Sequence, residues 1–198
     1  MPAAAVLEAI EAGQAAFGEN YVQEGVEKIL AVRQANAVHA VQWHAIGPIQ
    51  SNKSRVVAEH FDWVHSVDRF KLAQRLSEQR PSQLPPLQIC LQVNIDGGAN
   101  KSGVAAGDVL ALAQQVAALP RLQLRGLMTI PEPAEGFEEQ RRPHMAAKAL
   151  FEHVRASGHV DAALFDTLSM GMTADLEAAI DAGSTMVRVG TAIFGRRG

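Results

Sequence analysis

The chain has 198 residues, a length typical of one domain with a sizeable core, and we expect a single domain over residues 1–198. Hydrophobic residues make up 47% of the chain and charged residues 20%, values that argue against disorder. The formal net charge of −3 gives no electrostatic reason to expect nucleic acid, and no apolar stretch approaches the roughly 18 residues of a membrane span.

Helical and strand-like stretches alternate from the first residues onward. A helix is predicted from Pro2 to Gly13, because Val6, Leu7 and Ile10 share one helical face and proline suits a first turn. The pattern then predicts a strand at 15–20, a helix at 21–36, a strand at 41–47, a helix at 51–61, a strand at 63–68, a helix ending near 79, and a surface link at 80–86.

The same alternation continues to the end of the chain. It predicts a buried strand at 87–95, a helix at 107–120, a strand at 124–130, a helix at 136–157, a strand at 164–171, a helix at 173–183 and a last strand at 185–195. Seven strands separated by helices are typical of βαβ units and a parallel sheet.

Two architectures fit this order: an open doubly wound sheet, or a (β/α)₈ barrel of the TIM type that lacks its first strand. No GxGxxG motif follows any strand, which argues against a dinucleotide-binding sheet. Polar residues gather at the carboxyl ends of the predicted strands, where a barrel has its site. We therefore predict the barrel. These strand-end residues are Glu19, Asn20, His44, Asp68, Asn94, Thr129, Ser169 and Arg188.

A phosphate site is predicted at the ends of the last two strands, because barrels commonly hold a phosphate there. Gly171 and Gly190 would let backbone N–H groups approach an anion, since no side chain intervenes. Ser169 and Thr191 add hydroxyl donors, and Arg188 adds a cation.

Each of these residues also has a structural interpretation. Thr173 could cap the following helix, Gly190 could serve close packing, and Asp175 already complements the helix dipole. His44 could touch a ligand or be a hydrogen-bonded structural histidine. The histidines show no i, i+4 pair and no cluster with cysteine, so we predict no metal site.

Cys90 is the only cysteine and lies in a predicted buried strand, so an internal disulfide is excluded. We expect a buried structural thiol. No basic region followed by an apolar core is visible at the start of the sequence, and we expect a cytoplasmic protein.

Several motifs together resemble the YggS/PROSC family of pyridoxal 5′-phosphate homeostasis proteins. The motifs are FGENYVQE (17–24), WHAIGPIQSNKS (43–54), QVNIDGGANKSG (92–103), GLMTI (126–130) and LSMGMTADLEAAIDAGSTMVRVGTAIFG (168–195). The resemblance implies a barrel like the N-terminal domain of alanine racemase, bound pyridoxal phosphate, no established catalytic turnover, and a role in buffering or delivering the cofactor.

The resemblance also implies roles for residues. The family holds the cofactor's phosphate at positions that match Ser169, the backbone of Gly171 and Met172, Gly190 and Thr191. Arg188 and Asn20 would flank the ring, and His44 is a further expected contact. The implied partners are pyridoxal phosphate and pyridoxal-phosphate-dependent apoenzymes, with no nucleic acid, no membrane and a monomeric chain.

One departure from the family concerns a lysine. The family's first strand ends in a lysine that forms a Schiff base, a few residues before the proline that matches Pro2, so this lysine would fall before Met1. We expect that the printed sequence starts late, and that this chain binds the cofactor non-covalently through its phosphate. Lys101 is the remaining lysine near the ligand side, and we expect it to be solvated and protonated.

Three functions remain open at the level of sequence. We predict a cofactor-binding homeostasis protein without dedicated catalysis. The alternative is a pyridoxal-phosphate-dependent racemase or lyase, which would need a second acid/base on the other face of the ring, and Tyr21 is the only tyrosine. The third is a scaffold for another phosphorylated metabolite.

Overall fold

The computed structural model describes residues 2–35, 41–98 and 101–195. Its strands are β1 (Ala16–Glu19), β2 (Gln42–Ala45), β3 (Trp63–Val67), β4 (Leu87–Asn94), β5 (Val104–Ala105), β6 (Leu122–Thr129) and β7 (Thr167–Ser169). Its helices are α1 (Ala3–Glu11), α2 (Val22–Gln34), α3 (Ser54–His60), α4 (Phe70–Gln79), α5 (Val109–Ala117), α6 (Phe137–Arg155), α7 (Leu176–Asp181) and α8 (Thr191–Phe194). Two 3₁₀ turns, η1 (Ser51–Lys53) and η2 (Ala106–Asp108), precede α3 and α5.

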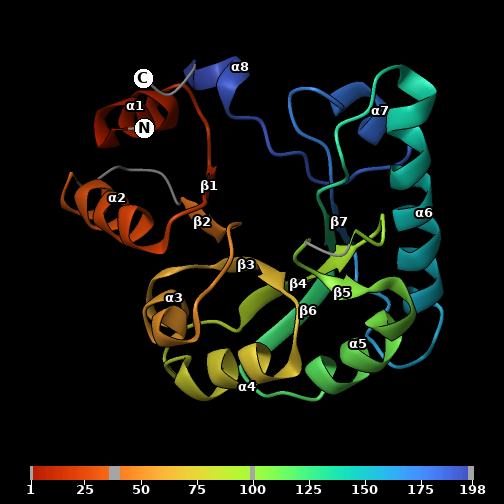
Figure 1. Cartoon of the computed structure of the whole chain (residues 1–198). Coiled ribbons are helices and arrows are strands. Elements are labelled where there is room, and N and C mark those ends of the chain that lie inside the picture. Colours follow the sequence, from red (N-terminus) through yellow and green to blue (C-terminus); the bar gives the residue numbers. More distant parts are fainter. Residues whose placement is uncertain (1, 36–40, 99–100, 196–198) are drawn as a thin grey trace.

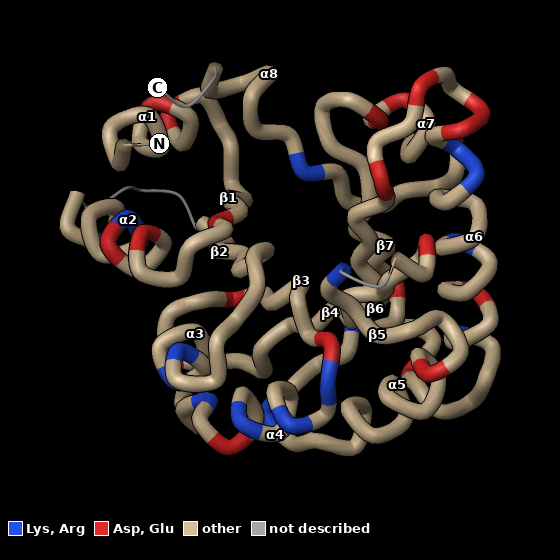
Figure 2. Tube along the Cα trace, viewed as in Figure 1, with Lys and Arg blue, Asp and Glu red and all other residues tan. Residues whose placement is uncertain are grey.

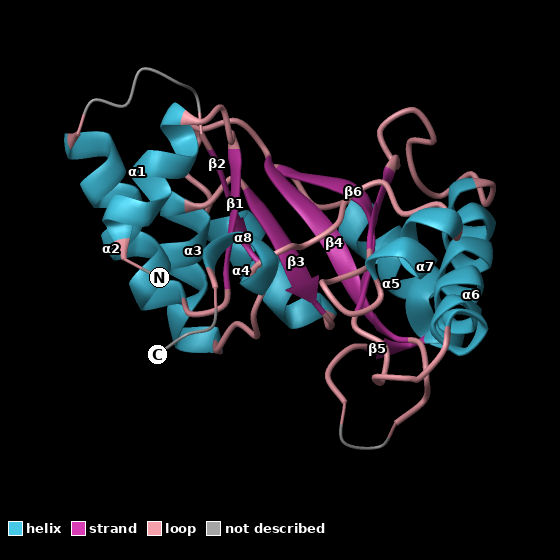
Figure 3. Ribbon diagram, turned by 90° about the horizontal axis from the view of Figure 1, so that it is seen from above, coloured by secondary structure: helices cyan, strands magenta, loops and turns pink. Residues whose placement is uncertain are grey.

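The strands form one curved sheet. All described pairs are parallel, and the order is β1-β2-β3-β4-β6-β7, with β5 paired to β4 off this path. Helices α1 to α7 line the outer, convex side of the sheet, and β1 and β7 lie at its two ends (Figures 1 and 3). This part of a barrel wall confirms the predicted (β/α)₈-type architecture, and the first described element is the helix α1.

The strand predicted at 185–195 is wrong over most of its length. In the described chain Met186 makes one isolated parallel bridge with Ser169, and the later residues form the short helix α8. A strand in a barrel wall pairs on both sides, whereas this segment meets β7 only among the described pairs. The sheet still has seven strands because it includes β5, whose two residues are too few to show a strand periodicity.

The buried side chains form two clusters on opposite faces of the sheet. The larger cluster lies between the strands and the outer helices and includes Val64 and Ile89. The smaller cluster contains Trp63, Cys90 and Met128. Trp63 and Cys90 are the direct sequence neighbours of Val64 and Ile89, and successive side chains of a strand point to opposite faces, so the smaller cluster lies on the inner face. The prediction of a buried structural thiol at Cys90 is thereby confirmed.

Charged side chains lie mainly on the helices and loops around the sheet (Figure 2). The strands β3 and β4 are almost entirely buried, as expected for parallel strands that are covered by helices. Within the described ranges, no helix combines the length and the apolar character needed to cross a membrane.

The link at 80–86 was predicted to lie on the surface, but Arg80 at its start is buried. The guanidinium donates hydrogen bonds to the carbonyl oxygens of Ala58, Phe61 and Pro85 at 2.7, 2.8 and 2.9 Å. These carbonyls lie near the end of α3 and in the link itself, where no regular partner is available. Arg80 therefore joins α3 to the chain entering β4.

A buried ion pair connects the carboxyl end of β1 to α2. Lys28 Nζ lies 2.8 Å from both carboxylate oxygens of Glu19, and both residues are buried. Glu24 is more exposed and lies 3.7 Å from the same ammonium group. Glu19 thus provides the main negative charge for a lysine that is removed from water.

We predict that the variant Glu19→Gln loses about 3 kcal/mol in free energy of unfolding, because it leaves the Lys28 ammonium buried without its carboxylate. The matched control Glu24→Gln removes the exposed partner and should lose less than about 1 kcal/mol. Urea denaturation of the three proteins measures both values. Equal losses in the two variants would contradict a stabilising role for the buried pair.

Candidate functional site

Two chain segments lie side by side at the carboxyl end of β7. Met170 N donates to Met186 O at 3.1 Å, and Arg188 N donates to Gly171 O at 3.0 Å. Residues 170–173 and 186–191 therefore form neighbouring walls at the edge of the sheet where a barrel places its site. The geometry brings together the two stretches that carry the predicted phosphate residues.

The two glycines of these walls differ in their surroundings. Gly171 has a φ of +92°, and a Cβ there would lie 2.5 Å from the Cβ of Ala179. A side chain at this position would meet both backbone strain and a steric clash. A Cβ on Gly190 would meet no atom within 4 Å, so Gly190 serves no close packing among the described residues and borders open space.

Two hydroxyl groups face each other beside Gly190. The Oγ1 atoms of Thr173 and Thr191 are 3.3 Å apart, and both residues are exposed. Thr173 does not cap α7, since the cap position is occupied by Asp175. The pair therefore offers donors at an open surface.

Arg188 is the cation of the site and has neutral partners. Its NH1 donates to Ser169 Oγ at 2.8 Å and its NH2 to the carbonyl of Thr129 at 2.9 Å. No carboxylate of the described chain forms an ion pair with it. Burial lowers the pKa of Arg188 to about 10, although the charge of Asp175 acts in the opposite direction. The guanidinium is thus a desolvated cation without a paired anion.

Ser169 connects Arg188 to two buried histidines. His65 Nδ1 lies 3.0 Å from Ser169 Oγ, and His65 Nε2 lies 2.9 Å from His44 Nδ1. Arg188 can only donate a hydrogen bond to the serine oxygen, so the serine hydroxyl can donate its own hydrogen bond to His65 Nδ1. His65 Nε2–H then donates to His44, which leaves His44 Nε2 as a buried donor with no partner in the described chain.

Both histidines are held in the neutral form. Burial lowers the pKa of His44 to about 4. Burial, together with the charges of His44 and Arg188, lowers the pKa of His65 well below its ordinary value. His44 also stacks on Trp63, with ring centroids 5.2 Å apart and planes inclined by 10°. A neutral pair is compatible with the nearby cation, whereas a protonated pair would repel it.

The remaining predicted residues take different places. Asn20 follows β1, and its carbonyl lies so close to Gly47 that a Cβ there would approach it to 2.1 Å. Asn20 thus packs against the loop after β2, outside the hydrogen-bond network of Arg188. Met172 is partly exposed, and its backbone N–H donates to Asp175 Oδ1 at 2.8 Å.

Lys101 is more restrained than the sequence suggested. Its Nζ lies 2.7 Å from Asp96 Oδ2 and 3.1 Å from Glu132 Oε1, and its side chain is only 22% exposed. Desolvation lowers the pKa of Lys101, but hydrogen bonds and charges from Asp96 and Glu132 outweigh it and raise the pKa above its ordinary value. The amine therefore stays protonated, as predicted, and is a poor nucleophile.

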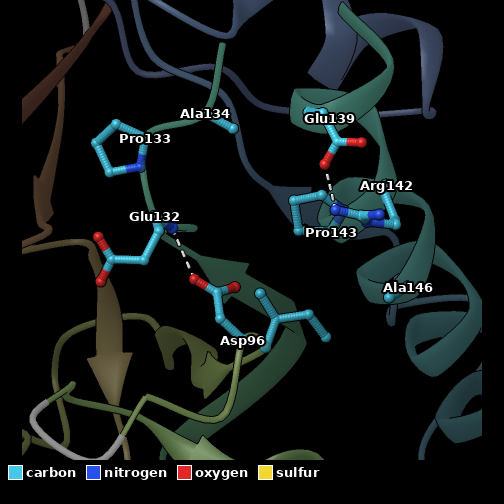
Figure 4. A pocket seen from close by; sticks show the side chains of 9 residues that line it. Asp96, Glu132, Pro133, Ala134, Glu139, Arg142, Pro143 and Ala146 are labelled. Carbon is cyan, nitrogen blue, oxygen red and sulfur yellow. Dashed lines mark hydrogen bonds and ion pairs between the residues drawn. The ribbon is translucent and has the colours of Figure 1, made fainter. Parts of the chain in front are cut away.

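A hollow of about 400 Å³ lies beside Asp96 and Glu132, the two partners of Lys101. It is bounded by α6 on one side and by the chain that follows β6 on the other (Figure 4). Asp96, Glu132, Glu139 and Arg142 supply its charged groups. It shares no lining residue with the walls around Arg188, and its carboxylates outnumber its one arginine. Its chemistry does not suit a phosphate, so the walls around Arg188 are the better anion site.

The sequence indicated Thr129 as a strand-end residue but not its role as a carbonyl acceptor, and it gave no indication of His65 and His144. His65 lies inside an apolar strand, and Thr129 contributes a backbone carbonyl that any residue could supply. His144 contacts Asp175 from a helix 31 positions earlier in the chain. Only the register of the strands and the packing of α6 bring these groups together.

A parallel α/β barrel wall with glycines, hydroxyl groups and an arginine at the carboxyl edge of its strands is typical of barrel proteins that bind phosphorylated ligands. The sequence matches the family described as "Alanine racemase, N-terminal domain" over residues 1–198. The chain belongs to this family.

Curated relatives are similar over nearly the whole chain. A "Pyridoxal phosphate homeostasis protein" of Pseudomonas aeruginosa is 57% identical over 198 residues, which cover 99% of this chain and 80% of that protein. Its namesake from Escherichia coli (strain K12) is 52% identical over 197 residues, which cover 99% of this chain and 82% of that protein.

Solved structures show the same architecture. PipY of Synechococcus elongatus with PLP bound has a TM-score of 0.85 at 35% identity, covering 98% of this chain and 88% of that one. An alanine racemase of Clostridium difficile has a TM-score of 0.70 at 16% identity, covering 97% of this chain and 48% of that one, a likeness of fold alone.

We predict that the neutral histidine pair makes the fold sensitive to acid. The unfolded chain takes up protons on these histidines below pH 6.5, whereas His44 in the folded chain resists protonation until about pH 4. The unfolded state therefore binds more protons between these values, and the free energy of unfolding falls as the pH drops. The slope is up to about 1.4 kcal/mol per pH unit for each histidine.

Chemical denaturation at pH 7 and pH 5 measures this loss. The variant His65→Gln should lose less stability between the two pH values than the unmodified chain, because one titrating group is gone. The control His153→Gln alters an exposed histidine and should keep the original loss. An unchanged loss in His65→Gln would contradict the neutral pair.

Proposed function

We propose that this chain is a pyridoxal-5′-phosphate-binding protein of cofactor homeostasis, built as a single barrel domain over residues 1–198. The similar proteins of Pseudomonas aeruginosa and Escherichia coli carry that name, and the similar PipY structure holds PLP. The proposal includes a cytoplasmic, monomeric protein that supplies pyridoxal-phosphate-dependent apoenzymes.

The observation that carries the proposal is the unpaired charge of Arg188. A partly desolvated cation without a paired anion is unfavourable, and an anionic ligand would offset that cost. A phosphate monoester such as pyridoxal phosphate brings close to two negative charges at pH 7. The neutral partners of Arg188 leave its charge available for such a ligand.

The site residues fit this cofactor in two ways. Gly190 borders open space, and the hydroxyls of Thr173 and Thr191 lie at its edge, so a phosphate could approach the backbone there. His44 Nε2 is a buried donor without a partner in the described chain. Gly171 and Met172 belong to the wall on the β7 side, and Ser169 lies behind it, with its hydroxyl bonded to Arg188 and His65.

The proposed ring contacts come from the resemblance to pyridoxal phosphate homeostasis proteins. Arg188, fixed by Ser169 and Thr129, would flank the ring, with Asn20 and His44 as further contacts from β1 and β2. When bound, the cofactor supplies an electron-withdrawing ring and an aldehyde. Lys101 is protonated and held by two carboxylates, which supports binding without a covalent bond to this lysine.

We predict that Gly190→Phe weakens the binding of pyridoxal phosphate by about 1–3 kcal/mol, because the phenyl ring fills open space and separates the donors from the phosphate. Gly107→Phe is a matched control. A Cβ added at Gly107 would also meet no atom within 4 Å, and Gly107 lies in η2, away from the site. Isothermal calorimetry with pyridoxal phosphate, and with pyridoxal as the phosphate-free ligand, measures both effects.

Equal affinity of the two variants for pyridoxal phosphate would place the phosphate elsewhere. Equal affinity of the unmodified chain for pyridoxal and pyridoxal phosphate would refute a phosphate site altogether. Exchange of the α-proton of an amino acid in the presence of the cofactor would instead support the racemase or lyase alternative.

A further inference from the structure

A buried histidine outside the site is connected to its wall through one carboxylate. His144 lies in α6, is fully buried, and its Nε2 is 2.8 Å from Asp175 Oδ2. The other oxygen, Asp175 Oδ1, accepts a hydrogen bond from Met172 N at 2.8 Å. The carboxylate therefore bridges an outer helix and the backbone of the wall at residues 170–173.

This bridge acts on the backbone that positions Arg188. Gly171 precedes Met172, and its carbonyl accepts the hydrogen bond from Arg188 N. Gly171 lies tightly against α7, because even a Cβ at this position would clash with Ala179. A displacement of Asp175 would therefore be transmitted through Met172 and Gly171 to the cation of the site.

Asp175 is also the carboxylate whose charge acts on Arg188. Its negative charge opposes the effect of burial on the pKa of Arg188, yet the two residues form no ion pair. Both side chains are partly buried, and opposite charges attract more strongly there than in water. The hydrogen bond from His144 holds Asp175 Oδ2 on the side of the carboxylate that faces α6.

We propose that His144 is a positioning residue of the site: it holds the Asp175 carboxylate against α6, so that Asp175 orders the Met172 wall and does not pair with Arg188. Arg188 is thereby left for an anionic ligand. This inference rests on the proposed function, because its ligand is the phosphorylated cofactor. His144 itself touches no part of the ligand.

The test compares dissociation constants for pyridoxal phosphate among variants of the 198-residue chain. His144→Leu removes the hydrogen bond and should weaken binding by about tenfold or more. This variant should remain folded, because Nδ1 of His144 has no hydrogen-bond partner among the described residues and a leucine removes a buried unsatisfied atom. Circular dichroism and the melting temperature check the fold.

Two further variants separate positioning from a packing role. His144→Gln can keep a donor near the position of Nε2 and should restore most of the affinity. The double variant His144→Leu/Asp175→Asn should also bind more tightly than His144→Leu alone. The amide introduced by Asp175→Asn carries no charge and cannot compete with the ligand for Arg188, while its oxygen can still accept from Met172 N.

Arg141→Gln serves as the control for helix packing. Arg141 pairs with Asp181 and so also joins α6 to α7, which lie side by side (Figure 1), and its ion pairs in the described chain go to Asp181 and Glu138 and not to the wall at residues 170–173. This variant should bind pyridoxal phosphate like the unmodified chain. A loss in Arg141→Gln as large as that in His144→Leu would overturn the specific role of His144.

The remaining outcomes are equally decisive. Unchanged affinity in His144→Leu, or no recovery in both His144→Gln and the double variant, would overturn the inference while leaving the proposed function intact. If the unmodified chain binds neither pyridoxal phosphate nor inorganic phosphate, the proposed function fails and the inference fails with it.

Discussion

The site depends on one constraint, a partly buried guanidinium that has only neutral hydrogen-bond partners. Arg188 is fixed by Ser169 on β7 and by the carbonyl of Thr129 on β6, and no described carboxylate pairs with it. Burying a charge without its counter-charge is unfavourable for an isolated fold. Such an arrangement is consistent with a site that gains stability when an anion binds.

The surrounding residues keep that charge available. His65 and His44 extend the network inward as neutral groups, so they satisfy Ser169 without adding a second cation. Asp175, the carboxylate whose charge acts on Arg188, is engaged by His144 and by the backbone of Met172. Parallel strands bring these groups together, because their carboxyl ends meet at one edge of the sheet.

Much of the fold could be predicted from local patterns. The strand at 87–95 and the helices around it are long, periodic and apolar, and the structure has them within a few residues of the predicted bounds. The last strand could not be predicted correctly, because the run at 185–195 has strand-like residues but pairs only at Met186 among the described residues. Its conformation depends on neighbours that a local pattern does not contain.

The site was predictable only in part, for a related reason. Gly171 and Gly190 could be chosen as candidates by residue type, since glycine lets a backbone approach a ligand closely, and Arg188 by its place after an apolar run. His65 and His144 carry no such signal, because a buried histidine has the same sequence context whether it is structural or part of a site. Their roles appear only when register and helix packing set the distances of 3.0 and 2.8 Å to Ser169 and Asp175.

The most direct test of the central claim is a crystal structure of this chain with pyridoxal phosphate. We predict the phosphate between residues 171–173 and 190–191, with Arg188 still bonded to Ser169 and facing the ligand. A cofactor bound in the hollow beside Asp96 and Arg142, or an Arg188 that pairs with Asp175 while the cofactor is bound, would contradict this claim.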